Sequence, residues 1–449
     1  MSIEKKKEPI FLVVGDLVIF LASLWLALFV RYQEIPSGRA FLQHMAPFAI
    51  LIVAWIVVFF IAGLYEKHTV FLKSRLPAII LNAQIANSAI ALAFFYLIPY
   101  FTIAPKLNLF IYLAVSFVLI LLWRLYGFAV TGTRKKYRAI LIGSGDEMRE
   151  LKDEVNTNAR YDVSFISSID LAGLGSLDFQ KEIVHRVYSE DVSMIAVDLR
   201  DERVEPILPH LYNLIFSNVR FIDMHRIYED IFDRIPLSLV KYSWFMENIS
   251  LGPNFTYDIL KRAMDIILSF SLGLLSLIVY PFIIVAIKLD DGGSIFSVQE
   301  RVGRNNSPIK LYKFRTMTNA NDGGNWGKQD NQITRAGNFL RMSRLDELPQ
   351  LWNVLQGGIS LIGPRPEFPG PVKQYENHVS YYNIRHLIKP GLSGWAQIHH
   401  DSAPHHGLDV RETKTKLSYD LYYIKNRSLL LDLKIALQTI KAILSRTGV

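Results

Sequence analysis

The sequence predicts a membrane protein of mixed α and α/β class, with a four-helix transmembrane bundle, a Rossmann-like α/β domain and a further membrane-embedded helix. Three observations predict this class. Four long apolar runs occupy the first third, short β-rich runs alternate with polar helical stretches in the middle, and one more apolar run follows. A chain of 449 residues has room for two or three domains.

Composition excludes several classes of protein. Hydrophobic residues make up 51% and charged residues 20%, which excludes a disordered chain. There is no cysteine, which excludes disulfides, thiolate catalysis and cysteine-ligated zinc or iron–sulfur sites. The formal net charge of +8 favours a membrane surface or phosphate-rich ligands. No DNA-binding motif is present, so we expect no nucleic-acid partner.

The four apolar runs are each about as long as the roughly 20 residues that a helix needs to cross a bilayer. They are Ile10–Val30, Ala46–Tyr65, Ala78–Ala104 and Leu107–Trp123. Four such runs in succession favour membrane helices over buried helices of a soluble core. Asp16, inside the first run, is expected to pair with a polar group on a neighbouring helix, in preference to a functional role.

Flanking basic residues predict the orientation of these helices. One side would carry Lys5, Lys6, Lys7, Lys67, Lys73, Arg75, Arg134, Lys135, Lys136 and Arg138, whereas the other would carry only Arg31, Arg39 and Lys106. The positive-inside rule therefore places the N-terminus and everything after Thr131 in the cytoplasm.

From Arg138 the pattern is typical of a doubly wound sheet, with strands expected at Arg138–Ile142, Val163–Ile169, Ser193–Val197 and Val219–Ile222. The first strand runs into Gly143-Ser144-Gly145, the usual start of a dinucleotide-binding loop. Met148 stands where the third glycine belongs, so we favour a scaffold or regulatory domain over a bound nicotinamide or flavin.

Ala263–Ile287 is a fifth apolar run, with one charge, Asp265, and with Pro281 inside it. Basic residues flank both ends, and proline bends a helix. A re-entrant helix that returns to the same face satisfies both facts, although a fifth crossing remains open. The hydroxyl of Ser276 or Tyr280 is a candidate partner for the freed backbone groups.

Asp346-Glu347 is the candidate reaction centre. Because Pro349 is tolerated only in a first turn, a helix is expected to begin near Asp346, with Ser343 as its cap. The helix dipole, with Arg341 and Arg344, would keep Asp346 ionised and nucleophilic and would seat a hard divalent cation. An ordinary acidic helix start is the alternative for an isolated pair.

Cations on proline- or glycine-bounded segments argue against that alternative. Lys313, Arg315 and Arg365 lie on such segments, and Pro364 and Pro366 hold Arg365 on a stiff backbone suited to phosphate binding. The polar, glycine-rich loop Asn319–Gly327 is predicted to act as a lid.

The run from Lys261 to the C-terminus resembles the bacterial monotopic phosphoglycosyl transferases, which are polyprenyl-phosphate sugar-1-phosphate transferases. The matching motifs are Lys261-Arg262-x-x-Asp265, Gln299-x-Arg301-x-Gly303, Lys313-Phe314-Arg315-Thr316-Met317, Leu345-Asp346-Glu347-Leu348, Gly363-Pro364-Arg365-Pro366, Lys389-Pro390-Gly391-Leu392-Ser393-Gly394-Trp395-Ala396-Gln397 and Leu431-Asp432-Leu433. The four preceding helices and the Rossmann-like domain resemble the long form of that family.

The resemblance implies an activity. Such enzymes move a sugar 1-phosphate from a UDP-sugar to undecaprenyl phosphate and release UMP, which starts exopolysaccharide, capsule or O-antigen synthesis. Asp346 would attack the β-phosphorus and carry a covalent phosphosugar, and Glu347 would place Mg²⁺ or handle protons. The substrate-binding residues would be Lys313, Arg315, Arg341, Arg365, Arg301, Arg385 and Gln397.

The resemblance also implies an organisation. Residues 1–130 would form the four transmembrane helices, 131–250 the Rossmann-like (CoA-binding-like) domain, and 251–449 a mainly α monotopic catalytic domain with a re-entrant helix at 262–288. The protein would be a multi-pass protein of the bacterial inner membrane, in contact with the bilayer. A homodimer formed through the Rossmann-like domain is a further hypothesis.

Two positions depart from the family pattern. Tyr280 precedes the bending proline, where serine is usual. His399-His400-Asp401 and His405-His406 replace an asparagine–glycine turn; we favour a solvated loop, then a sugar- or nucleotide-contacting loop, over a metal site.

Two other functions remain alternatives. One is a membrane-anchored nucleotide-sugar dehydratase, which would need a Tyr-x-x-x-Lys pair such as Tyr257 and Lys261, and the other is a non-catalytic polysaccharide-assembly scaffold. Tyr419–Ser445 suits helices on the membrane surface or in a soluble core. No residue identifies the sugar.

Overall fold

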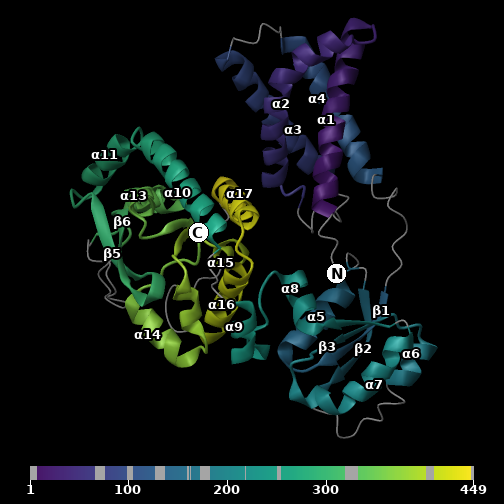
Figure 1. The fold of residues 1–449 in the computed structure, drawn as a ribbon. Helices are drawn as coiled ribbons and strands as arrows, with labels where there is room; N and C mark the ends of the chain where they lie inside the picture. The colour runs from purple at the N-terminus through teal and green to yellow at the C-terminus, as the bar shows by residue number, and fades with distance from the viewer. Residues whose placement is uncertain are drawn as a thin grey trace. The chain divides into compact units, whose positions relative to one another are not determined.

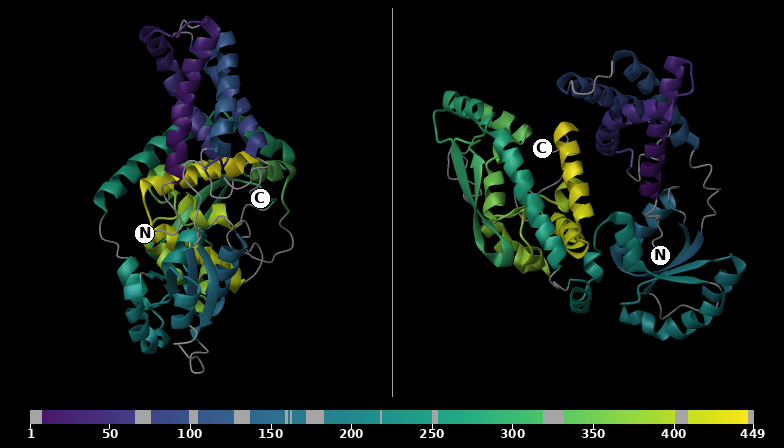
Figure 2. Two further views of the ribbon diagram at one scale, coloured as in Figure 1. Left: turned by 90° about the vertical axis from the view of Figure 1, so that its right-hand side faces the viewer. Right: turned by 45° about the horizontal axis from the view of Figure 1, so that its top comes forward.

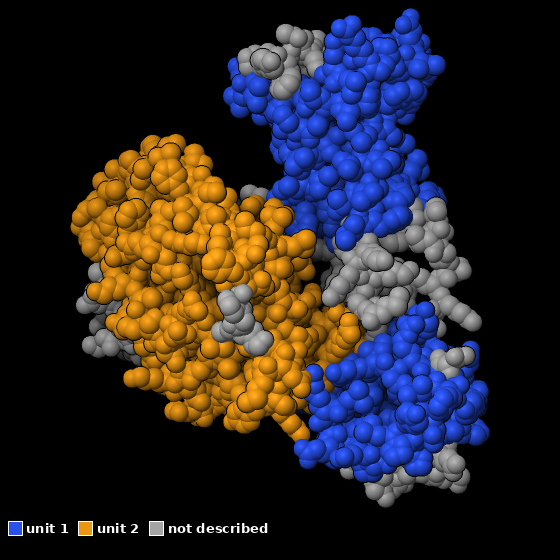
Figure 3. All heavy atoms as spheres, viewed as in Figure 1, with its two compact units in different colours: residues 1–224 blue, residues 225–449 orange. Residues whose placement is uncertain are grey.

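The computed structural model describes residues 8–65, 76–98, 105–126, 137–158, 161, 163–171, 183–217, 219–249, 254–318, 332–400 and 409–445. The predicted lid at 319–327 and the loop 401–406 lie outside the described residues. The chain divides into two compact units, Met1–Met224 and His225–Val449 (Figure 3). Each unit is described by itself.

Four apolar helices begin the first unit, as predicted: α1 Glu8–Tyr32, α2 Gly38–Ile61, α3 Leu76–Leu97 and α4 Pro105–Tyr126 (Figure 1). The first three are long and apolar enough to cross a membrane, and α4 has a shorter apolar segment, Leu109–Arg124. Buried aromatic rings pack between the helices, including Phe20, Phe48, Trp55, Phe59 and Tyr112. Many large apolar side chains face outward, including Ile10, Val53, Ile85 and Phe110. This distribution suits a bundle surrounded by lipid, so the chain is a membrane protein with several apolar helices.

Asp16 pairs with a polar partner on another helix, as predicted. Its carboxylate forms a buried ion pair with Arg124 of α4 and accepts a hydrogen bond of 2.9 Å from the Tyr65 hydroxyl. Arg124 also donates to the carbonyl oxygen of Leu64 at 2.8 Å. The network joins α1, α4 and the turn after α2, because a charge inside an apolar bundle is stable only when it is paired.

Removing one partner of this ion pair should destabilise the bundle. We expect Asp16→Leu or Arg124→Leu to cost about 3–5 kcal/mol, because each leaves an uncompensated buried charge. The double variant Asp16→Leu/Arg124→Leu should lose less than the sum of the two. Thermal unfolding in detergent measures this, and single variants that unfold like the wild type would contradict it.

A four-stranded parallel sheet follows, which confirms the Rossmann-like prediction. Its strand order is β2-β1-β3-β4, with β1 Tyr137–Gly143, β2 Val163–Asp170, β3 Met194–Val197 and β4 Arg220–Asp223. The helices of this unit that accompany the sheet are α5 Gly145–Thr157, α6 His185–Ser189 and α7 Leu208–Asn213, and α8 Met224–Phe232 begins at the last residue of the unit. In this order the first strand, β1, lies inside the sheet between β2 and β3, as in doubly wound folds.

The loop after β1 is tightly packed. Gly145 has φ +85°, a conformation that glycine adopts without strain. Arg203 donates to the Ser144 hydroxyl at 2.8 Å, and that hydroxyl donates to Asp201 at 3.3 Å. Met148, in place of a third glycine, is buried beneath the loop.

The second unit combines helices with two small sheets. Its helices after α8 are α9 Tyr242–Asn248, α10 Phe255–Ser276, α11 Tyr280–Asp290, α12 Arg335–Met342, α13 Gln350–Gln356, α14 Pro369–His378, α15 Trp395–His399, α16 Val410–Lys425 and α17 Leu429–Ser445. Strands β5 Phe296–Val302 and β6 Pro308–Phe314 form an antiparallel hairpin, and β7 Ser360–Ile362 pairs in parallel with β8 Gly391–Ser393. The predicted mainly helical C-terminal region is therefore present.

Helices α10 and α11 are the predicted bent apolar run. They meet at an angle of 57°, with Pro281 in the first turn of α11, where the missing N–H group costs no helical hydrogen bond (Figure 1). The Ser276 hydroxyl donates to the carbonyl of Gly273 at 2.6 Å, as expected for a polar group beside the break. A broken span and a re-entrant loop both have this geometry.

Charged residues on α10 connect the α10–α11 pair to the rest of the unit through hydrogen bonds and an ion pair. Arg262 donates to the carbonyls of Val354 and Leu355 at the end of α13, at 2.7 and 2.8 Å. Asp265 accepts from the backbone N–H of Leu361 in β7 at 3.1 Å. Lys261 forms an ion pair of 2.9 Å with the fully buried Asp432 of α17, which lies beside α10 (Figure 2).

The two C-terminal helices differ in burial. Leu417, Leu421 and Tyr423 of α16 are buried in the core of the unit. On α17, Ile435 is buried but Leu430 is 79% exposed. Thus α16 is a core helix, whereas α17 keeps an apolar face outward.

Candidate active site

The Asp346-Glu347 pair lies on a tight turn between two helices. Residues Leu345–Glu347 form one turn of 3-10 helix, and α13 begins only at Gln350, after Pro349. The prediction that Ser343 caps a helix starting near Asp346 is wrong. Ser343 ends α12, and its hydroxyl donates back to the carbonyl of Phe339 at 2.7 Å. Arg344, with φ +56°, turns the chain sharply between them, a strained backbone that is often found at functional sites.

Asp346 is buried and incompletely paired. Its side chain is 9% exposed, its Oδ2 lies 3.8 Å from the ammonium of Lys313, and its Oδ1 has no hydrogen-bond partner in the described part of the chain. Burial raises the pKa of Asp346, although Lys313 acts in the opposite direction and Glu347 adds to the rise. Burial therefore outweighs Lys313 and the nearby arginines, of which Arg341 and Arg344 were expected to keep Asp346 ionised.

Glu347 has the opposite electrostatic character. Its Oε1 accepts from Lys313 at 2.9 Å and from Arg365 at 3.0 Å. Burial alone would raise the pKa of Glu347, but Lys313 and Arg365 together hold it well below its usual range. The pKa of Glu347 is thus lowered while the pKa of Asp346 is raised, and such a separation is typical of catalytic carboxyl pairs.

Neighbouring strands and helices hold the turn on its apolar side. Leu345 and Leu348 pack in one cluster with Ile283 and Ile287 of α11 and Phe314 of β6. The bent apolar helix pair therefore touches the segment that carries the two carboxylates. The Asn353 amide donates to the carbonyl of Lys310 at 2.7 Å and accepts from the N–H of Tyr312 at 3.0 Å, which fixes α13 against β6.

The Gly363–Pro366 segment brings Arg365 to the pair. Gly363 and Gly391 approach so closely that a Cβ on Gly391 would lie 2.0 Å from the Gly363 nitrogen, so only glycine fits there. Behind Arg365, the guanidinium of Arg385 donates to the Arg365 carbonyl at 2.9 Å. Arg301 donates to the carbonyl of Pro366 at 3.2 Å. These contacts position Arg365 for its bond to Glu347.

The guanidinium groups of Arg385 and Arg301 bond mainly to other groups of the protein. Arg385 is buried, bonded to the Tyr382 hydroxyl at 2.6 Å and paired with Asp420 at 2.9 Å. Arg301 bonds to Gln299 at 2.7 Å, and burial together with Arg365 lowers its pKa to about 10. Both lie in the layer of residues behind Arg365.

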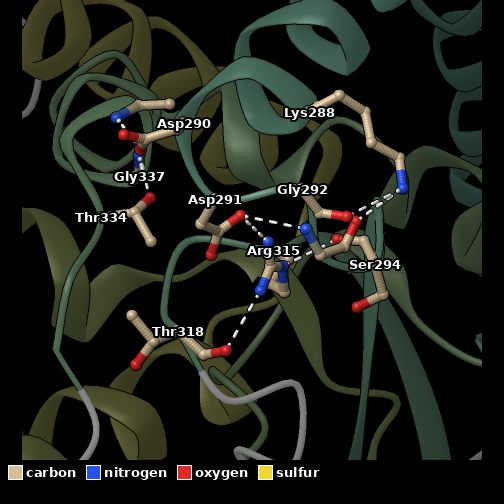
Figure 4. A network of polar contacts seen from close by, with 11 residues as sticks. Lys288, Asp290, Asp291, Gly292, Ser294, Arg315, Thr318, Thr334 and Gly337 are labelled. Carbon is tan, nitrogen blue, oxygen red and sulfur yellow. Dashed lines mark hydrogen bonds and ion pairs between the residues drawn. The ribbon is translucent and has the colours of Figure 1, made fainter.

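Arg315 lies in a different network, shown in Figure 4. Its guanidinium forms an ion pair with Asp291 and donates to the carbonyls of Ser294 and Thr318, at 2.7 and 3.1 Å. It thereby joins the end of α11 to β6 and to the last described residue before 319. Next to it, Asp290 accepts from the Ala336 N–H at 2.8 Å and so links α11 to the start of α12.

Arg341 and Gln397 are the remaining predicted residues. Arg341 donates to the Thr316 hydroxyl at 2.9 Å and is close enough to Asp346 to lower its pKa. Gln397 lies on α15, which packs on α16 and α17. Within the described residues, no hydrogen bond or ion pair joins Gln397 to the carboxylates. Arg344 was expected only to favour the ionised form of Asp346, and Asn353 was not predicted as a site residue. The signal available for Asn353 was its position just after Pro349.

A separate group of potential metal ligands lies at the carboxyl ends of two strands. Asp198 follows β3, Asp223 ends β4 and His225 comes two residues later, and their ligand atoms lie within 4.8 Å of one another. Parallel strands bring such side chains together at one edge of the sheet. This group was not predicted, because Asp198 is far in sequence from Asp223 and His225 and only the pairing of β3 with β4 brings them together.

Comparison with known proteins agrees with this geometry. A family model described as bacterial sugar transferase matches residues 256–446. A UDP-N-acetylgalactosamine-undecaprenyl-phosphate N-acetylgalactosaminephosphotransferase of Aeromonas hydrophila is 41% identical over 203 residues, which span 44% of this chain and 47% of that protein. The chain therefore spans about half the length of this relative.

Two more relatives extend the comparison. An uncharacterized sugar transferase of Bacillus subtilis, EpsL, is 36% identical over 192 residues, or 42% of this chain and 90% of that protein. A UDP-galactose-lipid carrier transferase of Erwinia amylovora is 29% identical over 356 residues, or 70% of this chain and 69% of that protein. Because this chain covers 90% of the Bacillus protein, and because the carboxylate turn lies inside the residues that the family model matches, the chain belongs to the bacterial sugar transferase family.

Proposed function

We propose that this protein transfers a sugar 1-phosphate from a UDP-sugar to undecaprenyl phosphate and releases UMP. The observation that supports this proposal most strongly is the buried Asp346 carboxylate. Its Oδ1 is unpaired in the described part of the chain, and cations lie beside it. Family membership and the activities named for the Aeromonas and Erwinia relatives support the reaction class. The bent apolar helix pair supports a membrane-resident acceptor.

Two displacements would complete the reaction. An Asp346 oxygen attacks the β-phosphorus of the UDP-sugar, and the bond from that phosphorus to the bridging oxygen breaks, so that UMP leaves with both electrons of the bond. An oxygen of the lipid phosphate then attacks the phosphorus of the phosphosugar-aspartate, and Asp346 leaves as a carboxylate. The raised pKa of Asp346 suits a nucleophile, provided that the pH is high enough to ionise it.

The surrounding cations would stabilise charge on the phosphate oxygens. Lys313 and Arg365 are held by one oxygen of Glu347, so Glu347 acts by positioning them. Arg341 and Arg344 add positive potential beside Asp346, whose pKa they lower, and Arg301 adds it beside Glu367, whose pKa it lowers. Arg315, Arg385 and Gln397 remain predicted to assist substrate binding.

Mg²⁺ is the metal that we propose for this site. The donor set fits, because Mg²⁺ is usually bound by one or two carboxylates together with substrate phosphates, and the buried Asp346 Oδ1 accepts no hydrogen bond from the residues that the structure describes. Asp346 and Glu347 would hold it, and it would supply charge neutralisation at the diphosphate.

We further propose that the N-terminus and the catalytic unit are cytoplasmic, in a bacterial inner membrane, with α10 and α11 re-entrant. The product would start an exopolysaccharide, capsule or O-antigen chain, and the protein would act as a homodimer. The dehydratase alternative is disfavoured, because the Tyr257 hydroxyl and the Lys261 ammonium are both bonded to Asp432, at 3.0 and 2.9 Å. The scaffold alternative is also disfavoured, because a non-catalytic scaffold would not require buried carboxylates paired with Lys313 and Arg365.

The test is UMP release from a panel of UDP-hexoses by purified protein with undecaprenyl phosphate and Mg²⁺. We expect release with one or two sugars and its loss on chelation, restored by added Mg²⁺. Folded protein that releases no UMP from any donor would argue for the scaffold. Activity that survives chelation would remove the metal from the proposal while keeping the reaction.

A further inference from the structure

A cavity of about 470 Å³ lies beneath the bend of the α10–α11 pair. Its walls come from both helices, from the β5–β6 hairpin and from the segment that follows the two carboxylates. The lining is mostly apolar and includes Phe270, Leu274, Leu277, Leu348, Leu351 and Trp352. Figure 1 shows the α10–α11 arc beside α13 and β6, the elements that enclose this space.

The cavity adjoins the proposed reaction centre. Leu348 and Pro349 line it and follow Glu347 directly, so its wall begins within about 8 Å of the Asp346 backbone, at 3.8 Å per residue. Successive side chains of a strand point to opposite faces. On β6, Lys313 contacts Glu347, while its neighbour Tyr312 lines the cavity. The carboxylate turn therefore has a cationic flank and an apolar flank.

We propose that this cavity holds the isoprene units next to the phosphate of the polyprenyl phosphate acceptor. The inference rests on the proposed function and assigns the acceptor a binding site. An acceptor that joins a phosphate to an isoprenoid chain matches a turn with one charged and one apolar flank, whereas a UDP-sugar has no apolar part to place there. The cavity has the size of a small-molecule pocket, so the rest of a long chain would extend beyond it into the bilayer.

Gly273 makes the cavity testable without disturbing the fold. It lies in the wall, on α10, and a Cβ built there meets no atom within 4 Å. Glycine also disfavours a helix interior, so a side chain at this position should keep α10 intact. Gly273→Trp would fill the cavity, Gly273→Ala would leave most of it open, and Leu275→Trp places the same ring on an exposed, non-lining position of the same helix.

The experiment separates the two halves of the reaction. Acceptor-free exchange of labelled UMP into the UDP-sugar reports donor chemistry, and transfer to a polyprenyl phosphate reports acceptor use. In Gly273→Trp we expect the KM for acceptor to rise about tenfold or more, since apolar burial is lost. Exchange should stay within about twofold of the wild type, as should all rates in Gly273→Ala and Leu275→Trp.

Acceptors of different chain length show which isoprene units the Gly273→Trp substitution affects. A phosphate with only two isoprene units should suffer the same loss in Gly273→Trp as undecaprenyl phosphate, because the cavity holds the units nearest the phosphate. An unchanged KM, a loss confined to the long acceptor, or an equal loss of exchange would each overturn the proposal.

A binding readout keeps the proposal testable whatever the protein catalyses. A short polyprenyl phosphate carrying a diazirine on its first isoprene unit should label Leu274, Leu351 or Trp352 in the full-length wild type. Undecaprenyl phosphate should compete for the label, and phosphatidylglycerol should not. Labelling elsewhere, or equal competition by the phospholipid, would overturn the cavity assignment. Failure of UMP release alone would overturn only the proposed reaction.

Discussion

Replacing Asp346 by asparagine is expected to lower UMP-forming turnover by about 10⁴-fold or more, because the amide has the same shape but is not a nucleophile. Stability should not fall with activity. A carboxyl group whose pKa is raised by burial destabilises the folded state progressively as the pH rises from its ordinary pKa to the raised one, and asparagine carries no charge. The thermal unfolding midpoint at neutral pH should therefore stay the same or rise.

Glu300→Gln is a matched control for this variant, since it removes an exposed carboxylate from β5 in the same unit. It should leave turnover within about twofold of the wild type. Substantial turnover in Asp346→Asn would exclude Asp346 as the nucleophile. A fall in its unfolding midpoint that accounts for the lost activity would make Asp346 a structural residue.

Replacing Lys313 by methionine is expected to lower turnover by about 10²–10³-fold, because it removes the cation that contacts both carboxylates. It should also shift the pH profile. Asp346 reacts as the carboxylate, so the rate rises as the pH passes its pKa. Lys313 lowers that pKa, and its removal should raise it further. The acid limb of the rate profile should therefore move to higher pH.

Lys310→Met is the control for the second variant, because Lys310 is exposed on the same strand. Its rate and pH profile should match those of the wild type. An acid limb that stays in place or moves to lower pH in Lys313→Met would show that another group controls ionisation at the site.

Patterns that depend on neighbours in the chain predicted the fold well. Apolar runs identified the N-terminal helices, and Pro281 located the bend between α10 and α11. The pairing of Asp16 also followed, because a lone carboxylate inside an apolar helix must find a partner. That the partner would be Arg124 did not follow, since 108 residues separate the two in sequence.

The site was harder to predict, because burial decides the role of each cation. Arg315, Arg365 and Arg385 look alike in sequence, yet only Arg365 of these three contacts Glu347 in the described part of the chain. Asp346 was expected to stay ionised beside cations, and the structure raises its pKa, because desolvation depends on packing by residues distant in sequence. Ser343 was misassigned because Leu345–Glu347 forms its own short turn before the helix.

The central claim is that Asp346 carries the phosphosugar. The most direct measurement is the intact mass of full-length protein incubated with its UDP-sugar in the absence of acceptor, followed by peptide mapping. We predict a mass increase of one sugar phosphate on Asp346, UMP in equal amount, and loss of the adduct when undecaprenyl phosphate is added. Protein that turns over with acceptor but forms neither adduct nor UMP without it would contradict the covalent route and favour direct transfer between the two substrates.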